Sequence, residues 1–319
     1  MGDAFLTRRG GASLRRLELL SPPDKLRYFT DEYLDMTGTI VGANFGSFTV
    51  PLHETAWQYS PLRALTPSDQ AVQITATLGR LTRQLSVPII VEDYRANLND
   101  NPWSAIARAA EQGIAGQIWN IGDSKFFDLN GTQIEARIVS FNADPLDEND
   151  ERYNDPAYNG GKKKAAMVFQ FFTSPGQSAL HNTSAIAGWD TCFMRVNTLT
   201  NLFAALPEDL RSAIRLVKKY TYFGYQTRDI VTADRLFLES LCELSINRDD
   251  NWGLEKENCI KYTLYANGIN PIHSVMNWTR TSHGAGCNVV NHYYRFNSSG
   301  NCGATNASQI LDYFPMFCI

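Results

Sequence analysis

The six cysteines are the side chains best suited to redox or metal chemistry, and they are widely scattered along the 319-residue chain. Neither a CxxC pair nor a Cys/His spacing suited to zinc occurs among them. We therefore expect reduced and mostly buried thiols. Two of them lie in a surface-like stretch near the end of the chain and could pair under oxidising conditions. These two are Cys287 and Cys302, and the other four are Cys192, Cys242, Cys259 and Cys318.

The five histidines form no recognisable catalytic pattern. The sequence has no G-x-S-x-G nucleophile elbow and gives no ordering partner to His181, His273, His283 or His292. His53 stands alone in a β-rich region, which is more typical of a structural residue than of a ligand. Phosphate-binding and dinucleotide-binding glycine motifs are also missing from the sequence. The sequence therefore predicts no enzyme, no catalytic residue and no cofactor.

One acidic stretch, residues 144–156, could in principle hold calcium, because calcium prefers oxygen ligands. Its spacing does not fit the EF-hand loop, and three lysines at residues 162–164 follow it. The sequence therefore predicts a solvated acidic loop and no metal site. The carboxylates concerned are Asp144, Asp147, Glu148, Asp150, Glu151 and Asp155.

Residues 281–308 have the composition of a contact surface. This segment contains no Lys, Glu, Asp, Gln, Met, Leu, Ile, Pro or Trp. Tyrosine supplies rigid amphipathic contact area, and Ser, Gly and Asn supply adaptable hydrogen bonds. Asn, Ser and Gly also dominate ordinary turns, so composition alone leaves a polar loop as an equal alternative. The apolar flanks favour a binding segment held between buried anchors, since binding loops are usually presented by a rigid scaffold.

Within this segment, a strand would turn alternate side chains inward. We expect Val289, Val290 and Phe296 to point inward. Trp278 and Arg280, just before the segment, are expected to support the scaffold, with Arg280 bonding a backbone group or a carboxylate beneath the site. The residues expected to face outward and bind ligand are Ser282, His283, Cys287, Asn288, Asn291, His292, Tyr293, Tyr294, Arg295, Asn301 and Cys302.

Two domains must position this segment. Residues 1–100 are expected to form a small β-rich domain for attachment or oligomerisation, after a possible short helix at residues 13–20. Its strand candidates lie at residues 37–50, 70–78 and 87–91. Residues 101–114 are expected to form a connecting helix, with Asn101 as its N-cap and Pro102 at its first position.

Residues 115–319 are expected to form the second domain, of mixed α+β class. A hairpin with an Asn130-Gly131 turn is predicted between two of its strands. The apolar C-terminus is best explained as a closing core strand, because exposed chain ends usually fray. Further predicted strands are residues 117–121, 124–129, 132–141, 166–172 and 260–265, and predicted helices are residues 189–202 and 207–217.

Five short motifs in this domain resemble one family in their order. They are IWNIGD at residues 118–123, IVSFN at 138–142, ALPEDL at 205–210, WTR at 278–280 and the terminal FCI. The chain resembles phage tail-associated proteins with a C-type lectin fold, including the variable proteins of diversity-generating retroelements. The resemblance covers roughly residues 115–319.

The resemblance implies a non-enzymatic ligand-binding protein whose segment 281–308 is diversified by adenine-directed mutagenesis. Every residue type in that segment is reachable from template Asn codons by changing adenines. The resemblance further implies a phage tail-fibre tip that recognises a bacterial surface molecule, a protein more than a glycan. Phage tail components, or further copies of the chain, would bind through the N-terminal domain.

Charge and hydropathy set the remaining bounds. A net charge of −4 disfavours non-specific binding to nucleic acid or anionic membranes. No apolar run approaches the length of a membrane span, and the basic N-terminus lacks the apolar core of a signal peptide. We therefore expect synthesis in the bacterial cytoplasm and assembly into a virion. Three alternatives stay open: a cell-surface display protein of the same family, a structural virion protein without a receptor, and a copper-dependent oxidase of the formylglycine-generating type.

Overall fold

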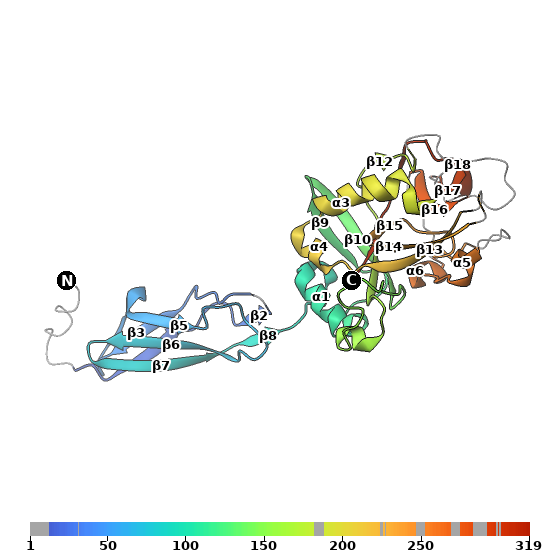
Figure 1. Ribbon diagram of the computed structural model, residues 1–319. Coiled ribbons are helices and arrows are strands. Elements are labelled where there is room, and N and C mark those ends of the chain that lie inside the picture. Colours follow the sequence, from blue (N-terminus) through green and yellow to red (C-terminus); the bar gives the residue numbers. More distant parts are fainter. Residues whose placement is uncertain are drawn as a thin grey trace. The chain divides into compact units, whose positions relative to one another are not determined.

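The computed structural model describes residues 13–30, 32–181, 188–223, 226, 228–246, 253–268, 275–282, 292–297, 299 and 301–319. The chain divides into two compact units, Met1–Arg95 and Ala96–Ile319 (Figure 1). Strands outweigh helices, so the protein is of the α+β class. Among the described residues, no helix is long and apolar enough to cross a membrane.

The first unit is β-rich, as predicted. Leu17, Val41 and Ile74 are fully buried in its core, and a parallel strand pair adds Tyr28. Two antiparallel three-stranded sheets, ordered β1-β3-β4 and β5-β6-β7, provide most of its backbone pairing. The strands are β1 (Arg16–Ser21), β2 (Arg27–Phe29), β3 (Ile40–Asn44), β4 (Thr49–Pro51), β5 (Trp57–Ser60), β6 (Ala71–Leu78), β7 (Leu81–Pro88) and β8 (Ile90–Glu92).

The helix predicted over residues 13–20 is wrong. Most of this stretch belongs to β1, where Leu17 pairs with Ala43 of β3 and enters the core. Helix propensity is a weak preference that tertiary pairing overrides.

The second unit contains two five-stranded sheets and a separate hairpin. The first sheet has the order β15-β20-β11-β10-β9, and the second has the order β12-β19-β16-β17-β18. The first comprises β9 (Ser124–Leu129), β10 (Thr132–Phe141), β11 (Met167–Phe171), β15 (Leu236–Phe237) and β20 (Met316–Cys318). The second comprises β12 (Gln177–Ser178), β16 (Asn277–Ser282), β17 (His292–Phe296), β18 (Cys302–Asn306) and β19 (Leu311–Asp312), and the hairpin is β13 (Val217–Phe223) with β14 (Arg228–Asp234).

Short helices complete this unit. A π-helical segment, η5, runs directly into α3, which is close to the helix predicted over residues 189–202. The helix predicted over residues 207–217 ends early, because Val217 already starts β13. The helices are α1 (Trp103–Glu111), α2 (Ala115–Ile118), η4 (Trp189–Thr191), η5 (Met194–Leu199), α3 (Thr200–Ala205), α4 (Glu208–Ala213), α5 (Gly253–Glu257) and α6 (Thr263–Ala266).

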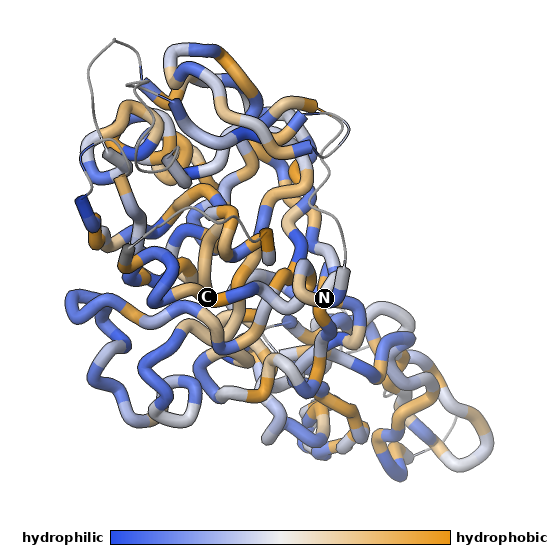
Figure 2. The backbone as a smooth tube through the Cα atoms, turned by 90° about the vertical axis from the view of Figure 1, so that its right-hand side faces the viewer, coloured by the Kyte–Doolittle hydropathy of each residue, from blue (hydrophilic) through white to orange (hydrophobic). Residues whose placement is uncertain are grey.

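The chain ends inside the core, as its apolar C-terminus predicts. Strand β20 pairs with β11 on one side and β15 on the other. The Phe317 ring stacks on Phe169 with centroids 5.1 Å apart, and Trp103 of α1 meets Phe317 edge-on at 5.8 Å. The C-terminus accordingly lies among hydrophobic strands in the middle of the unit (Figure 2). Helix α1 is therefore part of this second core, and not only a connector.

The predicted hairpin is confirmed. Asn130 and Gly131 take positive φ values of 52° and 85° between β9 and β10, as a tight turn requires. The predicted cap of α1 is wrong, because Pro102 holds the N-cap position and the Asn101 side chain bonds the carbonyl of Asn97 instead.

Two predicted strands are helices. Residues 117–121 contribute to the short helix α2 and the turn after it, and residues 260–265 contribute to α6. Both stretches mix apolar and polar residues over only five or six positions, which are too few for periodicity to separate a strand from a short helix.

The acidic stretch at residues 144–156 is only partly the solvated loop that the sequence predicts. Glu148 and Glu151 have side chains 69% and 72% exposed. Asp144, Asp147 and Asp150 are buried, and the carboxylate of Asp150 accepts a hydrogen bond from the backbone N–H of Leu216. Half of the carboxylates therefore build the fold and do not face water.

Candidate functional site

Strand β16 leads into the segment 281–308 and combines full burial with a mostly polar sequence. All six of its residues are buried, although five of the six are polar or charged. Buried polar groups are costly unless hydrogen-bonded, so each needs a partner in the surrounding scaffold. The strand is therefore held by specific bonds in addition to hydrophobic packing.

Arg280 is the centre of these bonds. Its guanidinium makes two bonds to Glu243, Nη1 to Oε2 at 2.5 Å and Nη2 to Oε1 at 2.7 Å. Its Nη1 also donates to the Leu238 carbonyl at 2.6 Å. The expected bonding of Arg280 to backbone and carboxylate is confirmed. A bidentate pair of this kind fixes both position and orientation.

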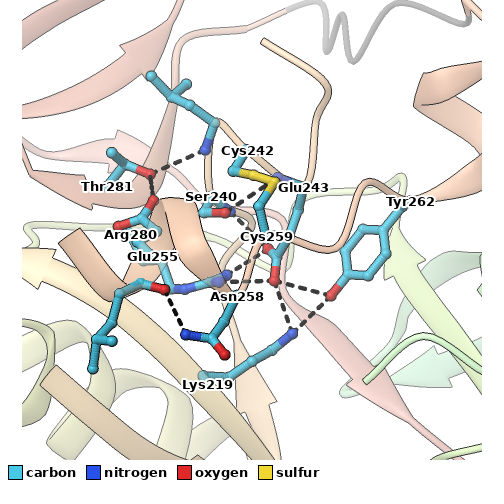
Figure 3. Close-up of a disulfide and its surroundings, with 12 residues drawn as sticks. Lys219, Ser240, Cys242, Glu243, Glu255, Asn258, Cys259, Tyr262, Arg280 and Thr281 are labelled. Atoms are coloured by element: carbon cyan, nitrogen blue, oxygen red, sulfur yellow. Dashed lines mark hydrogen bonds and ion pairs between the residues drawn. A yellow bond between two sulfur atoms is a disulfide. The ribbon is translucent and has the colours of Figure 1, made fainter. Parts of the chain in front are cut away.

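A second cation shares the same carboxylate. Lys219 of β13 donates from Nζ to Glu243 at 2.9 Å, to Asp144 at 2.5 Å and to the Tyr262 hydroxyl at 2.7 Å. In Figure 3, Arg280 and Lys219 both point at the Glu243 carboxylate. The side chains of this buried polar network come from strands, a helix edge and loops that are far apart in the sequence.

The ionisable groups of the network have shifted pKa values. Burial would raise the pKa of Glu243, but Arg280 and Lys219 outweigh it and lower the value to about 2. Burial raises the pKa of Glu239 to about 8 and that of Glu255 to about 7. Glu243 is thus ionised at neutral pH, whereas Glu239 favours the protonated form and Glu255 is about half protonated.

Shifted pKa values often mark active sites, but here the space argues for a structural role. The cavity bounded by Glu243, Glu255 and Arg280 has a volume of about 20 Å³. That is room for about one water molecule and not for a substrate. In the described part of the chain, no three His, Cys, Asp or Glu side chains are grouped so as to hold a metal ion.

A disulfide lies beside this network. The structure joins Cys242, next to Glu243, to Cys259, just after α5 (Figure 3). The expectation that the thiols are reduced is therefore wrong for this pair. Cys192 and Cys318 are free and buried, as expected, and Cys302 is half-buried. The spacing of 17 residues carried no recognisable disulfide signature.

The other side chains of β16 are also bonded. The Trp278 indole N–H donates to the Ser178 carbonyl at 3.0 Å, and the Thr279 hydroxyl donates to the Tyr294 carbonyl at 2.8 Å. The Thr281 hydroxyl bonds Glu255 at 2.8 Å, and the Ser282 hydroxyl bonds the Tyr222 carbonyl at 2.7 Å. The scaffold therefore bonds these side chains along β16 as far as Ser282.

Three of the residues expected to face outward are buried. Ser282, Tyr293 and Tyr294 are at most 3% exposed. Tyr293 and Tyr294 are neighbours on β17 and point to opposite faces of the sheet, so both faces of this strand are covered. The Tyr293 ring lies 5.7 Å from the His181 ring. These two tyrosines belong to the core, as does Phe296, whose inward orientation is confirmed.

Four expected residues remain accessible. His292, Arg295 and Cys302 are half-buried, and Asn301 is exposed. Nδ1 of His292 and Nε of Arg295 have no hydrogen-bond partner in the part of the chain that the structure describes. His283, Cys287, Asn288 and Asn291 lie outside the described residues, as do Val289 and Val290.

Sequence reasoning missed most of the network. Lys219, Glu239, Glu243 and Glu255 were not singled out, although the acidic residues at 239 and 243 interrupt an apolar run. A charged residue inside such a run is a usable signal, because charges are rarely fully buried without partners.

Comparison with known proteins adds no relative. A scan against protein-family models finds no family whose model matches this chain, and a search of curated proteins finds no significant match.

Proposed function

We propose that the protein is a non-enzymatic ligand-binding protein that presents the segment 281–308 from a rigid base. The observation that carries this proposal is β16, a fully buried strand whose polar side chains are bonded to the scaffold up to Ser282. Such a strand is a fixed base at the start of the segment. Binding residues are commonly carried by loops on rigid scaffolds.

The composition of the segment supports the same proposal. Asn, Ser, Gly, Tyr, His and Arg make up most of it, and these types suit adaptable recognition. We extend the proposal to the family that the motifs resemble, so that the unit has a C-type lectin fold and the segment is diversified by a retroelement. Variation in such a segment is tolerable only if the frame beneath it is stable without it. The buried polar network fixes the position of β16 within that frame.

The contact residues follow from exposure. His292, Arg295, Asn301 and Cys302 are the accessible members of the original set, and they lie on β17, on β18 or between them. We also keep as proposed contact residues four positions that lie within the segment 281–308 and outside the described residues: His283, Cys287, Asn288 and Asn291. Ser282, Tyr293 and Tyr294 leave it as contact residues, because their side chains pack in the core.

The proposed setting is a phage tail tip, with a bacterial surface molecule as the ligand. The first unit would join the protein to tail components or to further copies of itself. Several large apolar side chains are exposed on this unit, including Leu62 at 72% and Tyr33 at 66%.

A pair of variants tests the binding role. Replacing His292 and Arg295 with serine should abolish adhesion to the host cell and leave the melting temperature nearly unchanged, since both side chains are partly exposed. Replacing Phe296 with serine on the same strand is the matched control and should lower the melting temperature strongly, because this side chain is buried. Unchanged adhesion in the His292/Arg295 variant would contradict the proposal.

A further inference from the structure

A second cavity lies at the other edge of the sheet from β17 and β18. It has a volume of about 450 Å³, within the roughly 300–1,000 Å³ typical of small-ligand sites. The β9–β10 hairpin, strand β12 and the helical segment η5–α3 supply its walls, and these elements are drawn near one another in Figure 1. Because β12 and β18 are opposite ends of one sheet, this cavity is separate from the proposed contact residues.

The cavity carries no formal charge. None of the thirteen described residues that line it is Lys, Arg, His, Asp or Glu. An ionised ligand would need an opposite charge or several strong hydrogen bonds to offset its lost hydration. The lining therefore favours an uncharged ligand.

The polar groups of the lining are amides and hydroxyls. Gln177 bonds Asp312, and Ser178 and Thr198 bond each other, whereas other members of the lining have free capacity. Asn130 and Thr132 are exposed, and their side chains make no hydrogen bond to any described residue. Asn197 and Asn201 lie one helical turn apart, and the one bond between their amides is long, at 3.4 Å. Each amide offers both a donor and an acceptor, so together they can bond several ligand hydroxyls.

Tyr313 is the most informative member of the lining. Its side chain is only 6% exposed, yet its hydroxyl bonds no described residue while it borders the cavity. The hydroxyl oxygen itself is not fully buried, so it is open to the cavity and can bond water or a bound hydroxylated molecule there.

Apolar side chains form the other part of the lining. Leu129, Ile134 and Leu202 are buried and border the same space as the amides. A sugar ring has an apolar C–H face and a polar hydroxyl edge, so it matches a site with both kinds of group. A peptide would more typically use an apolar groove or a free strand edge. The edge strand beside this cavity, β12, has only two residues and is therefore too short to pair with a peptide over any length.

From this combination we infer that the cavity between the β9–β10 hairpin and α3 is a binding site for an uncharged saccharide of one or two rings. This site is independent of the segment 281–308. It would let the protein hold a surface glycan weakly, while the diversified segment makes the specific contact.

The test uses the full chain on an array that carries neutral glycans, acidic glycans and a peptide library. We expect binding to neutral glycans. Tyr313→Phe should weaken it about two- to twelvefold, the loss of one hydrogen bond of about 0.5–1.5 kcal/mol. Asn201→Trp should abolish it by filling the cavity. Tyr153→Phe and Asn154→Ala, which alter a hydroxyl and an amide outside the cavity lining, should bind like the parent protein.

The His292/Arg295 serine variant separates the two proposals, because it should keep glycan binding while it loses adhesion. Three results would overturn the saccharide site. One is the absence of any neutral glycan bound, the second is glycan binding that Asn201→Trp leaves intact, and the third is peptide binding that Tyr313→Phe removes.

Discussion

At the scale of single residues, the central feature is a buried arginine that holds β16, the strand that leads into the segment 281–308. Arg280 is 2% exposed and is bonded on both Nη atoms to Glu243. A buried pair of this kind contributes little compared with a well-packed apolar pair. Its role is better described as fixing the position of β16, because removing one partner leaves the other charge uncompensated.

We expect Arg280→Ala to lower the free energy of unfolding by about 3–5 kcal/mol, the usual cost of breaking a buried ion pair. Chemical denaturation measures this. Arg83→Ala, at an exposed position on β7, is the control and should change the stability by less than about 0.5 kcal/mol. A loss below 1 kcal/mol for Arg280→Ala would contradict the structural role.

The raised pKa values of Glu239 and Glu255 predict that stability depends on pH. Both folded-state values, about 8 and about 7, lie above the ordinary value of 4.5. The folded state therefore binds protons more tightly than the unfolded state, and this contribution is full below pH 4.5 and is lost as the pH rises through 7 and 8. The melting temperature should fall over this range, and Glu239→Gln with Glu255→Gln should flatten the fall.

Glu243 predicts the opposite dependence at acid pH. Its folded-state pKa of about 2 lies below 4.5, so its contribution is present above pH 4.5 and is lost as the pH falls towards 2.

A melting temperature that rises steadily from pH 5 to pH 9 would contradict the protonated states assigned to Glu239 and Glu255.

At the scale of elements, β16 and the disulfide beside its network form one frame. Cys242 and Cys259 close a loop that includes all of α5, which carries Glu255 against β16. The bond therefore restricts the loop that supplies one wall of the network. Replacing both cysteines with serine should lower the stability by about 3 kcal/mol, the usual value for a loop of this length.

Denaturation of the double serine variant, with and without reductant, measures this contribution. Reductant should shift the parent protein to the stability of the variant and leave the variant itself unchanged. Equal stability of the parent protein in both conditions would show that the bond contributes nothing. Cys192 is buried and free, so Cys192→Ser serves as a control that keeps the disulfide.

Local patterns predicted some elements and failed at others for physical reasons. The Asn130-Gly131 hairpin and the buried C-terminal strand were predictable, since turn chemistry and an apolar chain end are local signals. The strands predicted at residues 117–121 and 260–265 are wrong, because five or six residues are too few for periodicity to distinguish a strand from a short helix. Tyr293 and Tyr294 could not be placed from sequence, because alternation assumes that one face of a strand is open, and here both faces are covered.

Apart from the bonding of Arg280, the buried network could not be predicted from local sequence. Its partners Asp144, Lys219, Glu243 and Arg280 are brought together only by the tertiary fold. No periodic pattern encodes such pairings, whereas the composition of the segment 281–308 is visible directly in the sequence.

At the scale of the whole molecule, the chain consists of two units with separate cores. The second unit is closed by its own C-terminal strand and contains all the proposed contact residues. We expect a fragment of residues 96–319 to fold cooperatively and to bind the ligand with the affinity of the full chain. Calorimetry and surface plasmon resonance measure this, and a fragment without residues 316–319 should fail to fold.

The central claim is that a fixed frame carries a diversified segment, and sequencing this gene across a natural population tests it most directly. We predict that substitutions concentrate within residues 281–308, at codons where a nearby near-copy of the DNA has adenine. They should be frequent at the accessible positions His292, Arg295 and Asn301, and rare at Trp278 and Arg280. If residues 281–308 vary no more than residues 115–278, the account of a diversified binding segment is contradicted.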